Sequence, residues 1–381
     1  MRILVCDADY KHALGIVRAL GKAGHQSYAL AVGRRSLCFS SRYCAGELIA
    51  PDYDDPAFQH SLLELIERQH IELVIPVGTR SFKKLSSCKE EILRRANIVI
   101  ADNDAINFCM SKELTYQHAA RIGLPVPKTM YPYDMEQVAE FGKEIAYPCV
   151  LKGRFEVGYN IVTYANHRDD LIRKYQTLCT RHNLVKSEEL PMVQEYITGD
   201  GYGFFAIYNN GQCGPTFQHH RLREFPPSGG FSVASESDCH PRVLEFGKRL
   251  LDSLNWHGVA MVEFRMNAEG VPVLMEINPK FWGSLDLALE AGVDFPSAMV
   301  DVACKRDLQF CHEYRYPFRY HWPLHGDLLH AIMKPRNLVA VLGDCLNPRV
   351  GSNMWLMDDF RGTMGICRSV IKKAFRKLLT R

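Results

Sequence analysis

Two carboxylates and one amide lie on two consecutive apolar segments in the second half of the chain. Glu263 lies within the segment 259–266, and Glu276 and Asn278 lie within the segment 271–278. Both segments are short and largely apolar, so each is predicted to be a buried β-strand. A carboxylate is seldom fully buried unless it is paired or bound to a metal. The two glutamates therefore need a partner.

The pairing of these two strands would bring the three side chains together. Residues 267–270, Asn-Ala-Glu-Gly, form a short turn that contains glycine, which predicts a β-hairpin. Symmetric pairing about this turn puts Glu263 opposite Leu274. Because side chains alternate between the faces of a strand, Glu276 and Asn278 then share the face of Glu263. The two glutamates are expected to be diagonal neighbours, about 7–8 Å apart at the backbone.

Three oxygen-bearing side chains on one patch predict a site for a hard divalent cation. Carboxylate and amide oxygens suit Mg²⁺ better than zinc, and Mn²⁺ could take its place. Water and phosphate oxygens would complete the coordination sphere, which is how Mg²⁺ is usually held at nucleotide sites. The alternative is that one glutamate faces solvent or pairs with Arg265 or Lys280.

The elements that would position these residues fall into two units. The first hundred residues alternate strand-like with helix-like segments, which predicts a parallel, doubly wound sheet. The first strand is followed by Asp7-Ala8-Asp9-Tyr10 and not by GxGxxG, and two acids there would repel a pyrophosphate. We therefore expect a scaffold that forms one wall of a cleft. A second unit begins near Phe108, where Ser111 is expected to cap a helix over 112–122.

With these elements in order, the chain resembles the ATP-grasp superfamily, in particular its carboxylate–amine ligases of the carbamoyl-phosphate-synthase-like type. The resemblance lies in the acidic strand around Glu263 and in the stretch from Met275 to Ser284, which reads MEINPKFWGS. It covers roughly residues 1 to 305.

The resemblance implies a mixed α/β and α+β fold. A Rossmann-like pre-ATP-grasp domain would span 1–107, and a two-lobed ATP-grasp domain would span 108–305. Within that domain the small lid lobe would cover about 125–197 and the metal lobe about 198–305, which leaves 306–381 as a C-terminal extension.

The resemblance also assigns roles to individual residues and implies ATP and Mg²⁺ as cofactors. The activity it implies joins a small-molecule carboxylate to an amine through an acyl phosphate, with release of ADP and phosphate. Nucleotide contacts are expected from Lys112, Lys152, Gly153, Gly158, Glu195, Tyr196, Ile197 and Asp200. Metal ligands are expected to be Glu263, Glu276 and Asn278, and catalytic cations to be Arg221, Arg223 and Lys280.

The segment 219–232, HHRLREFPPSGGFS, is the candidate substrate loop. Arg221 and Arg223 are two residues apart, so in an extended chain they would point the same way. The glycine pair at 229–230 would let backbone amides approach an anion closely. We expect the acyl phosphate and the substrate carboxylate to be held here. The alternative is an ordinary surface loop with solvated arginines.

One departure from the family pattern leaves other functions open. Many members place several glycines after the second lysine, whereas 153–160 holds two glycines with bulky residues between them, and Arg154 could help to hold phosphate. A stiffer lid favours a module that binds and senses ATP without turning it over. Phosphorylation of a carboxylate without an amine acceptor is a further alternative.

Composition narrows the class of protein. Apolar residues make up 47% and charged residues 23% of the 381 residues, which is typical of a soluble globular protein. The net charge of +3 does not favour nucleic-acid binding. The thirteen scattered cysteines form no CxxC pair, which favours a reducing compartment. Without a secretory signal or an apolar run of about 18 residues, we expect a cytoplasmic location.

The end of the chain adds one further hypothesis. From 368 to 381 there are six basic residues and no acids, with an apolar stripe at helical spacing. Such a helix could rest on an anionic membrane surface and make the protein membrane-peripheral. The alternative is a terminal helix packed on the body with a solvated basic face. The sequence leaves an oligomer open and does not identify either substrate.

Overall fold

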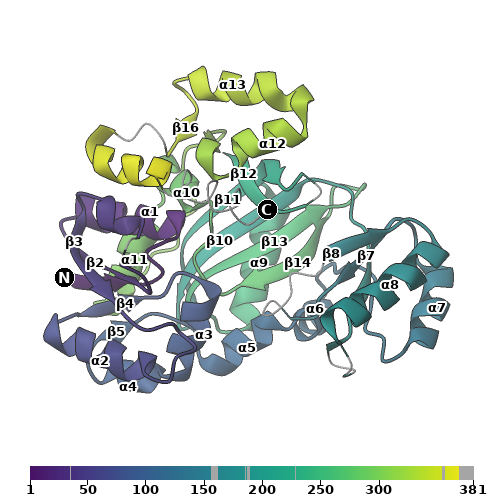
Figure 1. Ribbon diagram of the computed structural model, residues 1–381, viewed down its shortest axis with the longest axis horizontal. Coiled ribbons are helices and arrows are strands. Elements are labelled where there is room, and N and C mark those ends of the chain that lie inside the picture. The colour runs from purple at the N-terminus through teal and green to yellow at the C-terminus, as the bar shows by residue number, and fades with distance from the viewer. Residues whose placement is uncertain are drawn as a thin grey trace.

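The computed structural model describes residues 1–381 except 35, 156–161, 185, 187, 188, 228, 354–356 and 369–381. Within the described part of the chain, the strands form sheets of five, seven and four strands. Figure 1 shows the five-stranded sheet at the left, the seven-stranded sheet in the centre and the four-stranded sheet at the right. Gly158 and nearly all of the basic segment 368–381 lie outside the described residues.

The first hundred residues form the parallel sheet that the alternation of strands and helices predicts. Its strands are β1 Arg2–Val5, β2 Gln26–Ala31, β3 Cys44–Ile49, β4 Leu73–Ile75 and β5 Asn97–Ile98, in the order β3-β2-β1-β4-β5. Its helices are α1 Lys11–Lys22, α2 Phe58–Arg68, α3 Thr79–Ser87, α4 Lys89–Leu93 and α5 Asn103–Met110, with the 3₁₀ turn η1 Cys38–Ser40. Strand β4, and strand β1 after Arg2, are continuous apolar runs because a covered parallel sheet buries both of its faces.

The four-stranded sheet and two helices form a small separate lobe with its own apolar core. The helix α6 Lys112–Arg121 leads to this lobe and begins where Ser111 Oγ accepts a hydrogen bond from Leu114 N, so the predicted cap is confirmed. The strands are β6 Thr129–Met130, β7 Cys149–Lys152, β8 Val162–Ala165 and β9 Met192–Glu195, in the order β6-β9-β7-β8, and the helices are α7 Met135–Glu144 and α8 Arg168–His182.

The seven-stranded sheet carries the predicted hairpin at one edge. Its strands are β10 Gly201–Asn209, β11 Gln212–Phe225, β12 Phe231–Ser237, β13 Gly258–Met266, β14 Pro272–Asn278, β15 Arg319–His321 and β16 Gly351–Ser352, in the order β14-β13-β10-β11-β12-β15-β16. The helices in this part of the chain are α9 Pro241–Ser253, α10 Leu285–Ala291 and α11 Phe295–Ala303. The pairings from β14 to β15 are antiparallel, and β15 pairs with β16 in parallel.

The residues after β15 form short helices and turns. These are η3 Pro323–His325, α12 Asp327–Met333, η4 Pro335–Asn337, α13 Leu338–Leu346, η5 Met357–Asp359 and a helical segment at 360–368. Figure 1 shows α12 and α13 side by side at the upper edge of the molecule. Among the described residues, no helix combines the length and the apolarity that crossing a bilayer would take.

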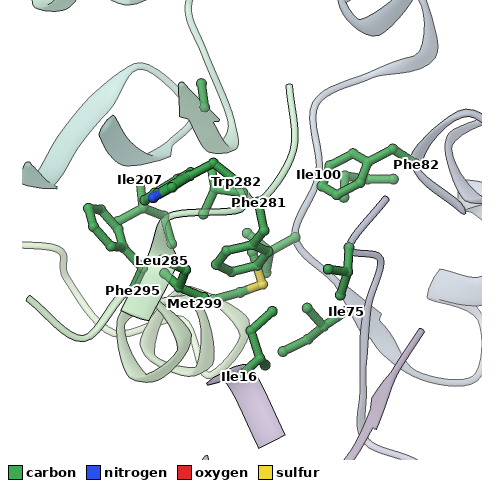
Figure 2. Packing of buried hydrophobic residues seen from close by; sticks show 14 of the residues in the cluster. Ile16, Ile75, Phe82, Ile100, Ile207, Phe281, Trp282, Leu285, Phe295 and Met299 are labelled. Atoms are coloured by element: carbon green, nitrogen blue, oxygen red, sulfur yellow. The ribbon is translucent and has the colours of Figure 1, made fainter. Parts of the chain in front are cut away.

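One continuous core joins the parallel sheet to the seven-stranded sheet. Figure 2 shows Ile16 and Ile75 of the first unit packed toward Phe281, Trp282 and other residues of the second. Phe281 and Trp282 follow β14 after two intervening residues and are almost fully buried. The chain that follows β14 is therefore packed against the parallel sheet of the first hundred residues.

Candidate functional site

The hairpin of β13 and β14 has a register that differs from symmetric pairing. Glu263 lies directly opposite Glu276, whereas Phe264 lies opposite Leu274, because a β-bulge interrupts the ladder. The bulge leaves Met275 without a paired residue on β13 and brings the two glutamates closer than diagonal neighbours would be. The predicted register was wrong, but the predicted meeting of the two carboxylates is present.

A single amide joins both carboxylates. Asn278 Nδ2 donates hydrogen bonds to Glu276 Oε1 at 2.9 Å and to Glu263 Oε1 at 3.2 Å. The Asn278 residue is only 3% exposed, but the side chains of Glu276 and Glu263 keep 25% and 17% of their surface exposed. These three side chains offer only oxygen ligands once the amide turns its oxygen inward. This donor set fits Mg²⁺ or Mn²⁺.

Three cationic side chains hold these groups from different elements. Lys112 Nζ lies 3.1 Å from Glu276 Oε2, and Lys280 Nζ donates to Asn278 Oδ1 at 2.8 Å. Arg221 on β11 donates from Nη2 to Glu263 Oε2. The structure thus brings six of the predicted site residues into direct contact. The three cations supply the positive charge that a bound divalent cation would otherwise supply to the two glutamates.

The charges shift the pKa values of the two glutamates in opposite directions. Burial opposes ionisation of Glu276, but the charges of Lys112 and Lys152 outweigh it and hold the pKa of Glu276 far below its usual range. Burial raises the pKa of Glu263, and the charge of Glu276 raises it further although Arg221 opposes the shift. Glu276 is therefore ionised, and its negative charge acts on the neighbouring carboxyl group of Glu263.

Lys152 ends β7 and belongs to the same field of charge. Burial lowers the pKa of its ammonium to about 8, although the charge of Glu276 opposes that shift. The neighbouring charge of Lys112 lowers the pKa further. Both lysines predicted to contact the nucleotide therefore act on Glu276 electrostatically, Lys112 from α6 and Lys152 from the small lobe.

The segment 195–200, which holds four of the residues predicted to contact the nucleotide, begins at the end of β9. Glu195 Oε1 accepts a hydrogen bond from Lys128 N at 2.8 Å, and Glu195 N donates to Lys128 O at 2.9 Å. The Tyr196 side chain is exposed and meets Tyr164 edge to face at 5.5 Å between ring centroids. Asp200, just before β10, is exposed.

Ile197 follows Tyr196 and is half-buried. The connection from 195 to 200 thus leads from the small lobe to the seven-stranded sheet, and the main chain at Asp200 is tied to β13 by Met266 N, which donates to Asp200 O at 3.0 Å.

The stretch after Lys152 is described only in part. Gly153 is half-buried, and Gly158 lies outside the described residues. The expectation that Arg154 helps to hold phosphate was wrong. Its guanidinium is buried and donates to the carbonyl oxygens of Leu190 at 2.8 Å and Pro132 at 2.6 Å, so it secures the small lobe instead.

The prediction that Arg221 and Arg223 point the same way was wrong. Arg221 reaches Glu263, whereas Arg223 donates to both carboxylate oxygens of Asp327 at 2.7 and 2.8 Å and to Asp344 at 2.5 Å. The pairing of β11 with β12 shifts between residues 221 and 223, and this bulge breaks the alternation of side chains. Arg223 is therefore not brought to the site.

Two residues that support the site were not predicted. Glu224 Oε1 accepts a hydrogen bond from Arg221 Nη1 at 3.1 Å, and Arg265 Nη2 lies 3.6 Å from Glu224 Oε2. Tyr116 OH donates to Met275 O at 2.6 Å and so fixes α6 to the bulged strand. Tyr116 follows Lys112 at i+4 spacing, which was a readable signal that both face the same strand.

A family model described as "ATP-grasp in the biosynthetic pathway with Ter operon" matches residues 192–323. Among curated proteins, a pyruvate carboxylase of Aspergillus terreus is 21% identical over 219 residues, which is 54% of this chain and 18% of that protein. The carbamoyl phosphate synthase large chain of Thermoanaerobacter pseudethanolicus is 20% identical over 279 residues, 69% of this chain and 25% of that protein. The match thus spans about a fifth to a quarter of the length of these relatives.

Solved structures resemble the chain over most of its length. A biotin carboxylase from Campylobacter jejuni in complex with β,γ-ATP has a TM-score of 0.68 at 15% identity, covering 84% of this chain and 74% of that one. An N5-carboxyaminoimidazole synthetase from Staphylococcus aureus complexed with ADP has a TM-score of 0.66 at 14% identity, covering 88% and 86%. At these identities the likeness shows the fold.

Proposed function

We propose that the chain, which has the ATP-grasp fold and matches an ATP-grasp family model over residues 192–323, joins a carboxylate to an amine and consumes ATP in doing so. The reaction would pass through an acyl phosphate and release ADP and phosphate. The observation that carries this proposal is that the Asn278 amide contacts the carboxylates of both Glu263 and Glu276.

The proposed metal ligands are Glu263, Glu276 and Asn278. Their oxygens fit Mg²⁺, with Mn²⁺ as a substitute, and an ion bound there would neutralise charge on the ATP phosphates. Lys112 and Lys152 would bind the phosphates, since both are cations that already act on Glu276. The segment from Glu195 through Tyr196 and Ile197, with Gly153, Gly158 and Asp200, is the proposed contact region for the rest of the nucleotide.

The first proposed step forms the acyl phosphate. A carboxylate oxygen of the substrate attacks the γ-phosphorus, the bond to the β-phosphate oxygen breaks, and ADP leaves. Little covalent help from the protein is needed, because positioning and charge stabilisation dominate phosphoryl transfer. Arg221 is placed for that task because it already lies on Glu263 and reaches the carbonyl of Gly230 at 3.2 Å in the proposed substrate loop.

The second proposed step forms the amide. The amine nitrogen attacks the acyl carbon, and phosphate leaves with the electrons of the broken carbon–oxygen bond while the nitrogen loses a proton. Lys280 and Arg221 would stabilise the tetrahedral oxyanion, because Lys280 lies one hydrogen bond from Asn278. Arg223 has no part in this proposal, since its guanidinium is engaged by two aspartates.

We keep the proposed division into a Rossmann-like pre-ATP-grasp domain at 1–107, an ATP-grasp domain at 108–305 and a C-terminal part at 306–381. The cytoplasmic location also stays a prediction. Two other functions remain candidates. One is a module that senses ATP without turnover, and the other is carboxylate phosphorylation without an amine.

The proposal is tested by ADP release in a matrix of substrates. Amino acids and uronic acids are offered as carboxylates, first alone and then with amines. Carboxylate-dependent ADP release that rises when an amine is added supports the ligase. Release with carboxylate alone and no amide product supports simple phosphorylation, and tight ATP binding without release in any mixture supports a sensor.

A further inference from the structure

Two short helices in the C-terminal part expose an unusual amount of apolar surface. The side chains of Ile332 in α12 and of Val339 and Leu346 in α13 are 73%, 81% and 84% exposed. The full set of strongly exposed apolar residues on these helices is Leu329, Ile332, Met333, Leu338, Val339, Leu342 and Leu346, here called the apolar face. Soluble proteins rarely expose so many large apolar groups together without a partner for them.

The apolar face is regular and firmly carried. Its members in α12 and in α13 recur at spacings of three and four residues, so each helix presents one apolar side outward. The opposite sides bury Ala331 and Val341. His330 Nδ1 lies 2.7 Å from Glu224 O, and Asp327 is bound by Arg223, so the helices are anchored to β11. The position of the apolar face is therefore fixed by contacts with the seven-stranded sheet.

Within the segment 327–350 that carries the apolar face, the outward charges have a single sign, although Glu290 of α10 lines the same pocket as Leu346. Lys334, Arg336 and Arg349 lie in or after the two helices, and none of them forms an ion pair among the described residues. The two acids of the segment 327–350 are Asp327 and Asp344, and both are turned inward to Arg223. What the segment shows to its surroundings is therefore apolar and positive.

This charge pattern decides between the candidate occupants. A second copy of the chain would bring the same three cations against these three. The chain's own end, 369–381, is also basic, with Lys372, Lys373, Arg376, Lys377 and Arg381 and no acids. Both would meet like charge at the rim of the apolar face, whereas an anionic lipid surface offers apolar depth and opposite charge together.

We propose that α12 and α13 dock the protein on an anionic membrane surface. The apolar side chains insert at the level of the lipid headgroups, and Lys334, Arg336 and Arg349 contact lipid phosphates and carboxylates. The protein binds without spanning the bilayer.

Co-sedimentation of the full chain with lipid vesicles tests this directly. The probes are vesicles of phosphatidylcholine alone and vesicles of phosphatidylcholine mixed with phosphatidylserine. The wild-type protein should sediment with the mixed vesicles, less at high salt, and weakly or not at all with phosphatidylcholine. The double variant Ile332→Glu/Val339→Glu should lose about tenfold or more of the affinity for the mixed vesicles.

The matched control carries the same two charges elsewhere. Ile49→Glu/Phe310→Glu replaces two apolar residues that are 46% and 52% exposed and lie outside α12 and α13. This control should bind the mixed vesicles nearly as the wild type does. Both double variants should keep the wild-type ATP affinity and melting temperature, which excludes unfolding as the cause.

Two results would overturn the proposal. The first is equal binding of the mixed vesicles by Ile332→Glu/Val339→Glu and by the control, which would leave the attraction to other parts of the chain, such as 369–381. The second is a concentration-dependent dimer that this variant breaks up, in a protein that ignores both kinds of vesicle. In that case the apolar face would be an interface between two copies.

Discussion

Arg221 and Arg223 lie two residues apart on β11 but enter ionic clusters of two different kinds. The first, here called the open cluster, contains Arg221, Lys112, Lys280, Glu263, Glu276 and Asn278. The second, the closed cluster, contains Arg223, Asp327, Asp344 and His321. A bulge in the pairing of β11 with β12 separates the two arginines.

The two clusters differ in how their charges are satisfied. In the closed cluster, Asp327 is fully buried and receives a two-pronged contact from Arg223 together with a contact of 3.0 Å from His321 Nδ1. The Asp327 carboxylate therefore has hydrogen-bond partners on both of its oxygens and needs no further ligand. In the open cluster, cations from three separate elements each reach a different acceptor, and part of each glutamate stays exposed.

The difference teaches how to tell a candidate site from a structural ion pair. Both clusters are buried enough to shift pKa values, and both combine arginine with acids. Only the open cluster has an excess of cations near an exposed edge, where phosphate oxygens could be received. His321, Asp327 and Asp344 have ligand atoms close enough to suggest a metal site, but the Arg223 guanidinium already lies on both acids.

The largest effect is expected from Glu276→Gln in the open cluster. Loss of this carboxylate should lower substrate-dependent ADP release about a thousandfold, because the metal and both phosphate lysines lose their common partner. The melting temperature should change little. Glu269→Gln, in the exposed turn of the same hairpin, is the matched control and should keep full activity. Unchanged turnover in Glu276→Gln would refute the assignment of the metal ligand.

Asp327→Asn in the closed cluster should lower stability and leave ATP affinity unchanged. Removal of one partner of a buried ion pair leaves Arg223 poorly compensated, so the free energy of unfolding should fall by about 3 kcal/mol. Denaturant unfolding measures this, with Asp307→Asn as the exposed control. At a temperature where the variant stays folded, its affinity for ATP should match that of the wild type. A large loss of ATP affinity with unchanged stability would show that the closed cluster belongs to the site.

Lys112→Met should separate binding from stability within the open cluster. The variant removes the contact of 3.1 Å with Glu276 and one proposed phosphate ligand, so KM for ATP should rise about tenfold. Lys83→Met, on the exposed surface of α3, should leave KM unchanged. An equal KM in both variants would argue against phosphate binding by Lys112.

The smallest effect is a pH dependence set by Lys152. Burial lowers the pKa of its ammonium to about 8, so the side chain is charged below that pH and neutral above it. ATP prefers the charged form, so its affinity should fall as the pH rises through 8, by about fourfold at pH 8.5. Isothermal titration at several pH values measures this. Lys152→Arg should remove the dependence, and an identical slope in that variant would contradict the assignment.

The sequence predicted the two glutamates and the asparagine of the open cluster from local rules, whereas Lys112 was expected only from the resemblance to the ATP-grasp superfamily. The turn at 267–270 sets the hairpin, and a spacing of two residues puts Glu276 and Asn278 on one face. A carboxylate in an apolar strand also signals a partner without any knowledge of the fold. The register itself failed, because the bulge at Met275 has no clear signature in a single sequence.

The closed cluster could not be predicted for a different reason. Asp327 and Asp344 lie 104 and 121 residues from Arg223 along the chain, so only the tertiary fold brings them together. The error on Arg223 came from applying strict alternation across two register shifts in β11. The parallel sheet of the first hundred residues was easier, since the alternation of apolar strands with amphipathic helices specifies it.

The most direct test of the central claim is the binding of Mn²⁺ to the protein with a non-hydrolysable ATP analogue, followed by electron paramagnetic resonance. The wild type and Glu269→Gln should hold Mn²⁺ in a complex that needs both protein and nucleotide. Glu276→Gln should lose this protein-bound signal while it stays folded. If Glu276→Gln binds Mn²⁺ and nucleotide as tightly as the wild type, then Glu263, Glu276 and Asn278 do not form the metal site.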